Sequence, residues 1–138
     1  MITGESGSGK ELIAKAIHNS SQRCDQNYVV VDSGSLNDNL LESELYGHQK
    51  GAFTGAQHNK VGYLEQAHRG TLILDEINST TPAFQARLLR VIEEGEFKKA
   101  GSTETMKVDV RFISISSASI EEKVADNTFR KDLYYRLN

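Results

Sequence analysis

The sequence is poor in residues that cross-link or interrupt a chain. Its 138 residues include one cysteine, one proline and no tryptophan. A single cysteine, Cys24, excludes an internal disulfide and is typical of a reducing compartment. No proline-rich or low-complexity stretch marks a linker, so we expect one domain or part of one, long enough to bury a single core.

Charge and hydropathy argue against a nucleic-acid-binding segment and against a membrane or secreted protein. The formal net charge is -3 with both signs mixed, which gives no support for general nucleic-acid binding by this segment. No apolar run approaches the roughly 20 residues that a membrane helix needs, and no secretory signal peptide is visible. We therefore expect a cytoplasmic domain with no membrane partner.

A glycine-rich loop lies almost at the start, where the sequence reads Gly4-Glu5-Ser6-Gly7-Ser8-Gly9-Lys10. Two glycines bracket four residues and a lysine follows, which is the spacing of a phosphate-binding loop. Glycines allow successive backbone N–H groups to converge on an anion, and Lys10 would add a positive charge for the outer phosphates. The strict motif continues with Ser or Thr, whereas this chain has Glu11. The alternative is a glycine- and serine-rich turn before an ordinary helix.

The residues after the loop predict a helix. From Glu11 to Asn19 the apolar residues Leu12, Ile13, Ala16 and Ile17 fall on one helical face. The positive end of this helix would lie under the phosphates.

A second signal is the run from Thr71 to Glu76, where an apolar strand ends in two acids. A central parallel strand of this kind delivers carboxylates to a catalytic edge. In phosphate-loop enzymes the first acid, here Asp75, holds magnesium, and a following glutamate, here Glu76, can polarise the attacking water. The alternative is a strand that ends in a solvated acidic turn.

The other segments alternate between strand and helix patterns. This alternation around a glycine loop predicts a three-layer α/β fold with a mostly parallel sheet, and ligand at the carboxyl ends of the strands. Strands are expected at 28–32 and 108–115, and helices at 36–45, 84–94, 120–125 and 129–138.

Two further segments are ambiguous on pattern alone. Residues 47–56 are rich in glycine around Phe53, which suits a mobile loop with an apolar tip or a plain surface loop. The tail places Arg130, Lys131 and Arg136 among apolar residues, as in an amphipathic helix with solvated basic side chains.

The hexapeptide Gly51-Ala52-Phe53-Thr54-Gly55-Ala56 carries a family resemblance. With segments 4–11, 42–48, 70–77 and 129–138, it resembles the AAA+ domain of sigma-54-dependent transcription activators, the bacterial enhancer-binding proteins. The resemblance spans essentially the whole chain, and it accounts for Glu11 because that family commonly has Glu after the lysine.

The resemblance implies a phosphate-loop ATPase fold of the AAA+ type, with ATP and Mg2+ as cofactors. Residues Gly4 to Glu11 would bind the phosphates, Asp75 would hold magnesium and Glu76 would activate water. Arg130 and Arg136 match the family's arginine fingers, which act in a neighbouring subunit's site, so hydrolysis would require a ring, a hexamer in the full-length protein.

The same resemblance implies two macromolecular partners. The loop from Gly51 to Ala56 would contact the sigma-54 factor of promoter-bound RNA polymerase, and DNA would be bound by a separate domain. By this comparison the chain is a partial domain, residues 1–138, with its first strand clipped and the C-terminal helical lid absent. We expect such a piece to bind nucleotide weakly and to assemble poorly.

Two positions depart from the family pattern. Asp32 stands where an asparagine usually restrains the catalytic glutamate, and Ser117 stands where an asparagine usually senses the terminal phosphate. Aspartate cannot donate an amide hydrogen bond, and serine is shorter. The function predicted first is an ATPase motor that remodels the polymerase. The alternative is a nucleotide-responsive oligomerising module with weak or absent hydrolysis, and a generic phosphate-loop kinase or GTPase would leave the hexapeptide and the arginines unexplained.

Overall fold

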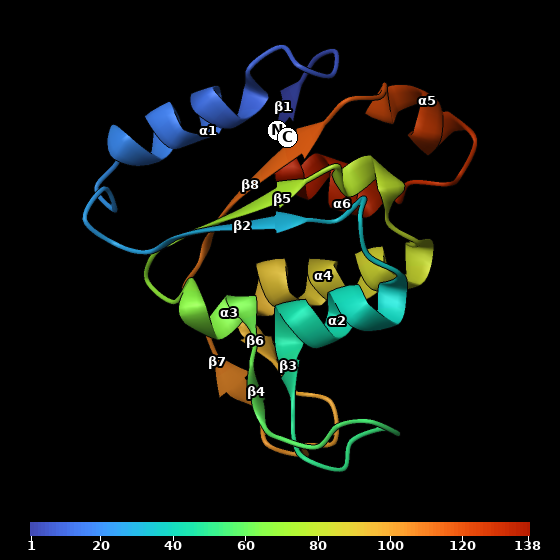
Figure 1. Cartoon of the computed structure of the whole chain (residues 1–138). Helices are drawn as coiled ribbons and strands as arrows, with labels where there is room; N and C mark the ends of the chain where they lie inside the picture. The colour runs from blue at the N-terminus through green and yellow to red at the C-terminus, as the bar shows by residue number, and fades with distance from the viewer.

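The computed structural model describes residues 1–138 as a sheet between two layers of helices (Figure 1). Four parallel strands form the sheet in the order β1-β8-β5-β2. They are β1 (Ile2–Thr3), β2 (Tyr28–Asp32), β5 (Thr71–Asp75) and β8 (Arg111–Ser116). This arrangement confirms the predicted three-layer α/β fold with a parallel sheet.

One helix covers one face of the sheet, and several helices cover the other. Helix α1 (Lys10–Asn19) packs on the first face. The second face carries α2 (Asp38–Tyr46), α3 (Tyr63–Gln66), α4 (Pro82–Glu94) and α6 (Lys131–Leu137). The short helix α5 (Ile120–Ala125) and the 3-10 turn η1 (Ile77–Ser79) connect strands to these helices. None of the helices combines the length and the apolar composition of a membrane span.

Two small hairpins extend from the helical layer. Strand β3 (Gly47–His48) pairs with β4 (Lys60–Val61), and β6 (Glu96–Phe97) pairs with β7 (Met106–Lys107), both antiparallel. The predicted strand at 108–115 therefore starts three residues too early. Residues 108–110 carry the chain from the β6–β7 hairpin back to the sheet, and β8 begins at Arg111.

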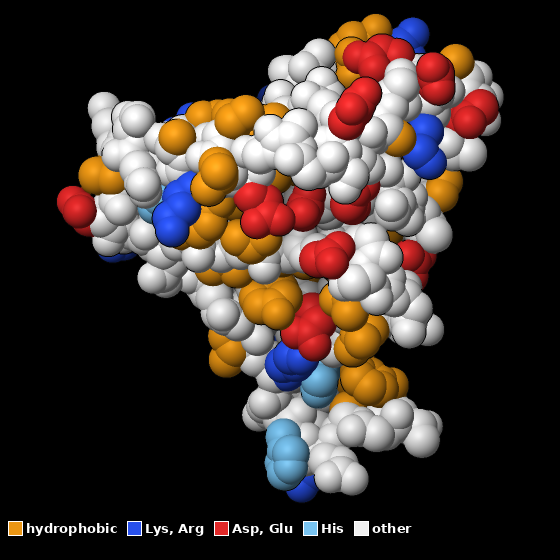
Figure 2. Space-filling model, turned by 45° about the horizontal axis from the view of Figure 1, so that its top comes forward, with side chains coloured by type: hydrophobic (Ala, Val, Ile, Leu, Met, Phe, Trp, Pro, Cys, Tyr) orange, Lys and Arg blue, Asp and Glu red, His pale blue; other side chains and the backbone are white.

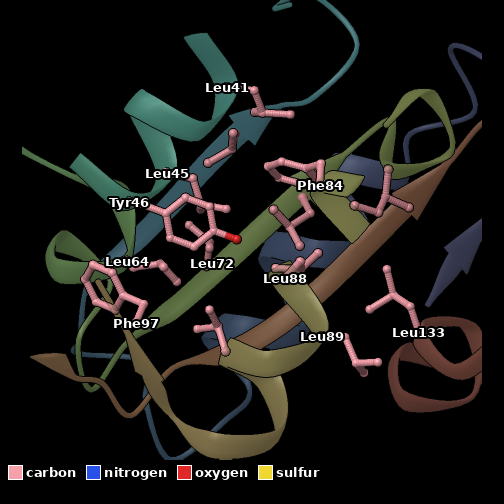
Figure 3. Packing of buried hydrophobic residues seen from close by; sticks show 14 of the residues in the cluster. Leu41, Leu45, Tyr46, Leu64, Leu72, Phe84, Leu88, Leu89, Phe97 and Leu133 are labelled. Carbon is pink, nitrogen blue, oxygen red and sulfur yellow. The ribbon is translucent and has the colours of Figure 1, made fainter. Parts of the chain in front are cut away.

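The side chains of β5 show why the core has two parts. Leu72 and Leu74 point into the larger cluster, with Leu45, Phe84 and Leu88 among its members (Figure 3). Ile73, between them on the strand, points to the opposite face and packs with Ala14, Ile113 and Ile115 under α1. Alternation along a strand that is covered on both faces explains its continuous apolar sequence.

The helix predicted after the glycine loop is confirmed as α1, but of the apolar residues on its predicted common face only Ile17 packs partly against the core. Leu12 is 75% exposed, Ile13 and Ala16 are also exposed, and the buried side chains are those of Lys10, Ala14 and His18. The phosphate loop fixes where α1 begins, and this start sets which side chains face the sheet. His18 Nδ1 lies 2.9 Å from the Thr71 hydroxyl oxygen, which joins the end of α1 to the start of β5.

Candidate nucleotide-binding site and partner loop

The loop from Gly4 to Gly9 connects β1 to the first turn of α1. Gly7 and Gly9 have φ angles of 78° and 83°, in the left-handed region that other residues rarely adopt. No side chain caps α1, so N–H groups at its start are free for an anion. The loop therefore has the backbone geometry that phosphate binding requires.

Lys10 folds back over this loop. Its ammonium group donates to the carbonyl oxygens of Gly4 and Glu5, each at 2.8 Å, and the residue is only 8% exposed. Both partners are neutral acceptors, whereas phosphate oxygens are charged and form stronger hydrogen bonds with an ammonium group. Lys10 thus lies beside the loop with its charge uncompensated by any carboxylate in an ion pair.

Asp75 and Glu76 lie at the carboxyl end of β5, the central strand between β8 and β2. Burial raises the pKa of Asp75, and the negative charges of Glu76, Glu11 and Asp32 raise it further, while a 3.0 Å hydrogen bond from the Glu76 N–H opposes them. A carboxyl near other acids is in an electrostatic environment that a bound cation would relieve, although no three His, Cys, Asp or Glu side chains converge as a metal site.

The glycine loop and the two acids share one cleft of about 320 Å³. Its lining includes Ser6, Gly7, Gly9, Lys10, Glu11, Asp75 and Glu76. Segments separated by more than sixty positions in the sequence therefore face the same space, at the carboxyl ends of parallel strands where ligands of such sheets bind. Asp32 and Ser117 do not line this cleft, although both lie near Glu76.

Glu76 has a strained backbone and a fixed side chain. Its φ and ψ angles of 52° and 42° are left-handed, which is uncommon for a residue with a side chain and occurs at functional sites. One oxygen of its carboxylate accepts a 2.6 Å hydrogen bond from the Ser117 hydroxyl. The group at the predicted sensing position thus holds the predicted catalytic glutamate.

Asp32 makes a different set of contacts. Its Oδ1 accepts hydrogen bonds from the N–H groups of Gly34 and Ser35, at 2.9 and 3.2 Å. The backbone of Gly34 lies close to both side chains. A Cβ added there would lie 3.2 Å from the Glu76 Cβ and 3.4 Å from Asp32 Oδ1. Asp32 therefore stabilises its own turn, and the hydrogen bond that restrains Glu76 comes from Ser117.

The loop from Gly51 to Ala56 lies far from this cleft, at the end of the β3–β4 hairpin. Figure 1 shows the hairpin at the end of the molecule opposite the glycine loop, and the projection at the lower end of the space-filling view in Figure 2 corresponds to it. The Gly51 N–H donates to the Ala56 carbonyl at 2.8 Å and closes the loop. Phe53 is 48% exposed and packs edge-on against His48 at 5.0 Å between ring centroids. The structure thus presents an aromatic side chain near the tip of a projecting hairpin.

The β6–β7 hairpin supports this loop, and sequence analysis gave it no role. Ala100 exchanges backbone hydrogen bonds with Gly47 and Gln49 at the base of the β3–β4 hairpin. A Cβ added at Gly101 would lie 2.8 Å from the Cβ of Ala52. The only local signal was the Gly-Ser turn at 101–102, because the contact joins segments about fifty residues apart.

Arg130 and Arg136 do not line the cleft of their own chain. Both side chains are exposed, and the Arg130 guanidinium pairs with Asp132 at 2.6 and 3.0 Å, which raises the pKa of Arg130. Arg130 immediately precedes α6, and Arg136 lies in the last turn of that helix. The two arginines share one short helical segment whose outer surface is open to solvent.

Comparisons with known proteins agree with this geometry. The family model described as the Sigma-54 interaction domain matches residues 1–138. The Nif-specific regulatory proteins of Herbaspirillum seropedicae and Azospirillum brasilense are 53% and 54% identical over all 138 residues, which correspond to 26% and 22% of their lengths. The chain thus spans about a quarter of these relatives.

Solved structures of a related protein have the same fold. A crystal structure of NtrX from Brucella abortus has a TM-score of 0.93 and 41% identity, covering 100% of this chain and 31% of that one. A second NtrX structure, in complex with ATP, has a TM-score of 0.90 at 41% identity and covers 100% of this chain and 29% of that one.

Proposed function

The chain belongs to the Sigma-54 interaction domain family, and from this premise we propose that it is the ATP-binding and ATP-hydrolysing part of a sigma-54-dependent transcription activator. The observation that carries the proposal is the shared cleft, in which Lys10 and the start of α1 face Asp75 and Glu76. A triphosphate bound there would contact N–H donors on one side and the acids that handle metal and water on the other.

Each side chain has a role that its contacts support. Lys10 would exchange its two carbonyl partners for phosphate oxygens. Asp75 would hold Mg2+, whose charge, when bound, offsets that of the phosphates. Glu76 would orient the attacking water, with Ser117 keeping its carboxylate in place.

Hydrolysis would be shared between subunits. Arg130 and Arg136 are exposed and lie outside their own cleft, so we propose that they complete the site of a neighbour in a ring. The loop from Gly51 to Ala56 would then move against the sigma-54 factor of RNA polymerase in the cytoplasm. DNA would be bound by a separate domain of the parent protein.

The test is ATP turnover by the full-length protein as a function of protein concentration. A cooperative rise supports catalysis between subunits, and a constant rate per subunit contradicts it. Lys10→Ala should abolish ATP binding. Glu76→Gln should keep ATP binding and abolish turnover, which separates loss of the base from loss of the site.

The second candidate is a nucleotide-responsive oligomerising module with weak or absent hydrolysis. Asp32 favours it, because this side chain caps its own turn and makes no hydrogen bond to Glu76. If wild-type turnover is near zero and the double change Asp32→Asn with Ser117→Asn raises it, the second candidate is supported. A high rate of ATP turnover by the wild-type protein would contradict the second candidate.

A further inference from the structure

A buried glutamine joins the segment that follows Glu76 to the segment that carries Arg130. Gln85 lies in the first turns of α4 and is 0% exposed. Its Nε2 donates to the carbonyl oxygens of Thr80, at 2.8 Å, and Thr128, at 3.2 Å. Its Oε1 accepts from the backbone N–H of Arg130 at 2.8 Å.

The three partners determine the orientation of the amide. Two of them are carbonyl oxygens, which only accept, and the third is an N–H group, which only donates. The opposite orientation would place like groups together at all three contacts. Gln85 is therefore a specific connector whose loss would leave buried backbone groups without partners.

The connected segments are held on both sides of Gln85. Thr80 is buried and ends the η1 turn that begins immediately after Glu76, and its hydroxyl donates to the Ile77 carbonyl at 2.7 Å. On the other side, Phe129 and Leu133 are buried next to Arg130. The Arg130 backbone is thus anchored in the core while its guanidinium extends to solvent.

We propose that Gln85 is a positioning residue for Arg130, and that it links the catalytic segment of one subunit to the arginine that the subunit supplies to its neighbour. The inference rests on the proposed function in trans. The side chain contacts no nucleotide site itself, so its effect is transmitted through the backbone of Arg130. The opposing interpretation is a glutamine that only satisfies buried polar groups for stability.

The variants are made in the full-length protein. Gln85→Met has a similar length without hydrogen bonds, and Gln85→Asn keeps the amide but is one methylene shorter. The matched control is Val91→Ala, on the same helix but beside Phe97, where it removes core volume away from Arg130. We expect both Gln85 variants to bind ATP normally and to lose roughly 10- to 100-fold in kcat, as for a misplaced catalytic group. Val91→Ala should lose stability and keep its kcat.

Mixing subunits distinguishes positioning from stability. A Lys10→Ala subunit binds no ATP in its own site but retains an intact Gln85 and Arg130 for its neighbour. Mixed with Gln85→Met subunits, which retain Lys10 and Glu76, it should restore turnover well above the sum of the two variants alone. Absence of rescue, with mixed oligomers verified, would overturn the proposal.

A double-variant comparison gives an independent result. On an Arg130→Ala background, Gln85→Met should cause no further loss of kcat, because both changes remove the same contribution. A full additional loss would place the effect elsewhere and contradict the proposal. If Gln85→Met is insoluble, Gln85→Asn replaces it in both experiments. An inactive wild-type protein would instead count against the proposed ATPase function itself.

Discussion

The Ser117 hydroxyl donates a 2.6 Å hydrogen bond to the carboxylate of Glu76. This contact links the end of β8 to the residue that follows β5, at the edge of the cleft that also contains Lys10. It gives the half-buried side chain of Glu76 a preferred position. The structure thus connects the strand next to the phosphate loop with the proposed catalytic base.

Removing this hydroxyl should slow turnover. We expect Ser117→Ala to lower kcat roughly tenfold with little change in ATP affinity, because a charge-assisted hydrogen bond that orients Glu76 is lost. Steady-state kinetics of the full-length protein measure the effect. Ser119→Ala removes a hydroxyl two residues away, at the start of α5, and should leave kcat unchanged. A higher kcat for Ser117→Ala would mean that the bond restrains Glu76 in an inactive position.

The left-handed backbone of Glu76 should reduce the stability of the fold. Glu76→Ala and Glu76→Gly both lose the carboxylate and its bond to Ser117, but only glycine adopts this conformation without penalty. The glycine variant should therefore be more stable than the alanine variant by about 1 kcal/mol. Denaturant unfolding gives both values, and equal stabilities would show that the strain is relieved elsewhere.

The raised pKa of Asp75 predicts a stability cost at neutral pH. Its folded pKa lies above the ordinary value of 3.8, so the folded protein binds this proton more tightly than the unfolded chain. The free energy of unfolding should fall as pH rises from 3.8 through the folded pKa of Asp75, and it should stay at this lower value at higher pH. Asp75→Asn should stabilise the nucleotide-free protein at pH 7 by a small amount, because solvent screens the charge of this partly exposed group.

A second variant, Asp126→Asn, should change the stability in the opposite direction and serves as the control. Hydrogen bonds from Thr128 lower the pKa of Asp126, so Asp126→Asn should destabilise the protein at pH 7. Thermal unfolding between pH 3 and pH 8 follows both variants. The advantage of Asp75→Asn should disappear below 3.8. A lower melting temperature for this variant at pH 7 would contradict the prediction.

Tyr46 contains a hydroxyl group with no partner. The ring is 2% exposed, its hydroxyl makes no hydrogen bond, and burial raises the pKa of the phenol (Figure 3). Tyr46→Phe should stabilise the protein by about 1 kcal/mol, because an unpaired buried polar group is removed. Tyr46→Leu should destabilise it, since the guanidinium of Arg87 stacks on this ring 4.4 Å from its centroid. A loss of stability in Tyr46→Phe would reveal a partner for the hydroxyl.

The contact between Gly101 and Ala52 predicts an effect on the projecting loop alone. Gly101 has a φ of 77°, and an added Cβ would overlap Ala52 at 2.8 Å. Gly101→Ala should displace the loop from Gly51 to Ala56 and weaken sigma-54 binding roughly tenfold or more, while ATP affinity stays unchanged. Pull-down with sigma-54 and nucleotide titration measure the two quantities. Unchanged sigma-54 binding by Gly101→Ala would contradict the prediction.

Much of the fold and of the candidate site is determined by local sequence. The spacing of Gly4, Gly9 and Lys10 predicts the loop, and the apolar run before Asp75 predicts the central strand with acids at its end. These features can be predicted from the sequence because glycine conformation, strand burial and helix capping depend on neighbouring residues. The same holds for the alternation of strands and helices, which specifies a parallel sheet with its ligand edge.

The tertiary structure decides the contacts between distant segments. It sets the rotation of α1, so that Ala14 and His18 face the sheet and Leu12 faces solvent. It brings Ser117 to Glu76 and the Arg130 backbone to Gln85, pairs 41 and 45 residues apart. Hydrogen bonds of this kind depend on how whole elements pack, and polar residues such as serine and glutamine have no periodic pattern that reveals a buried partner.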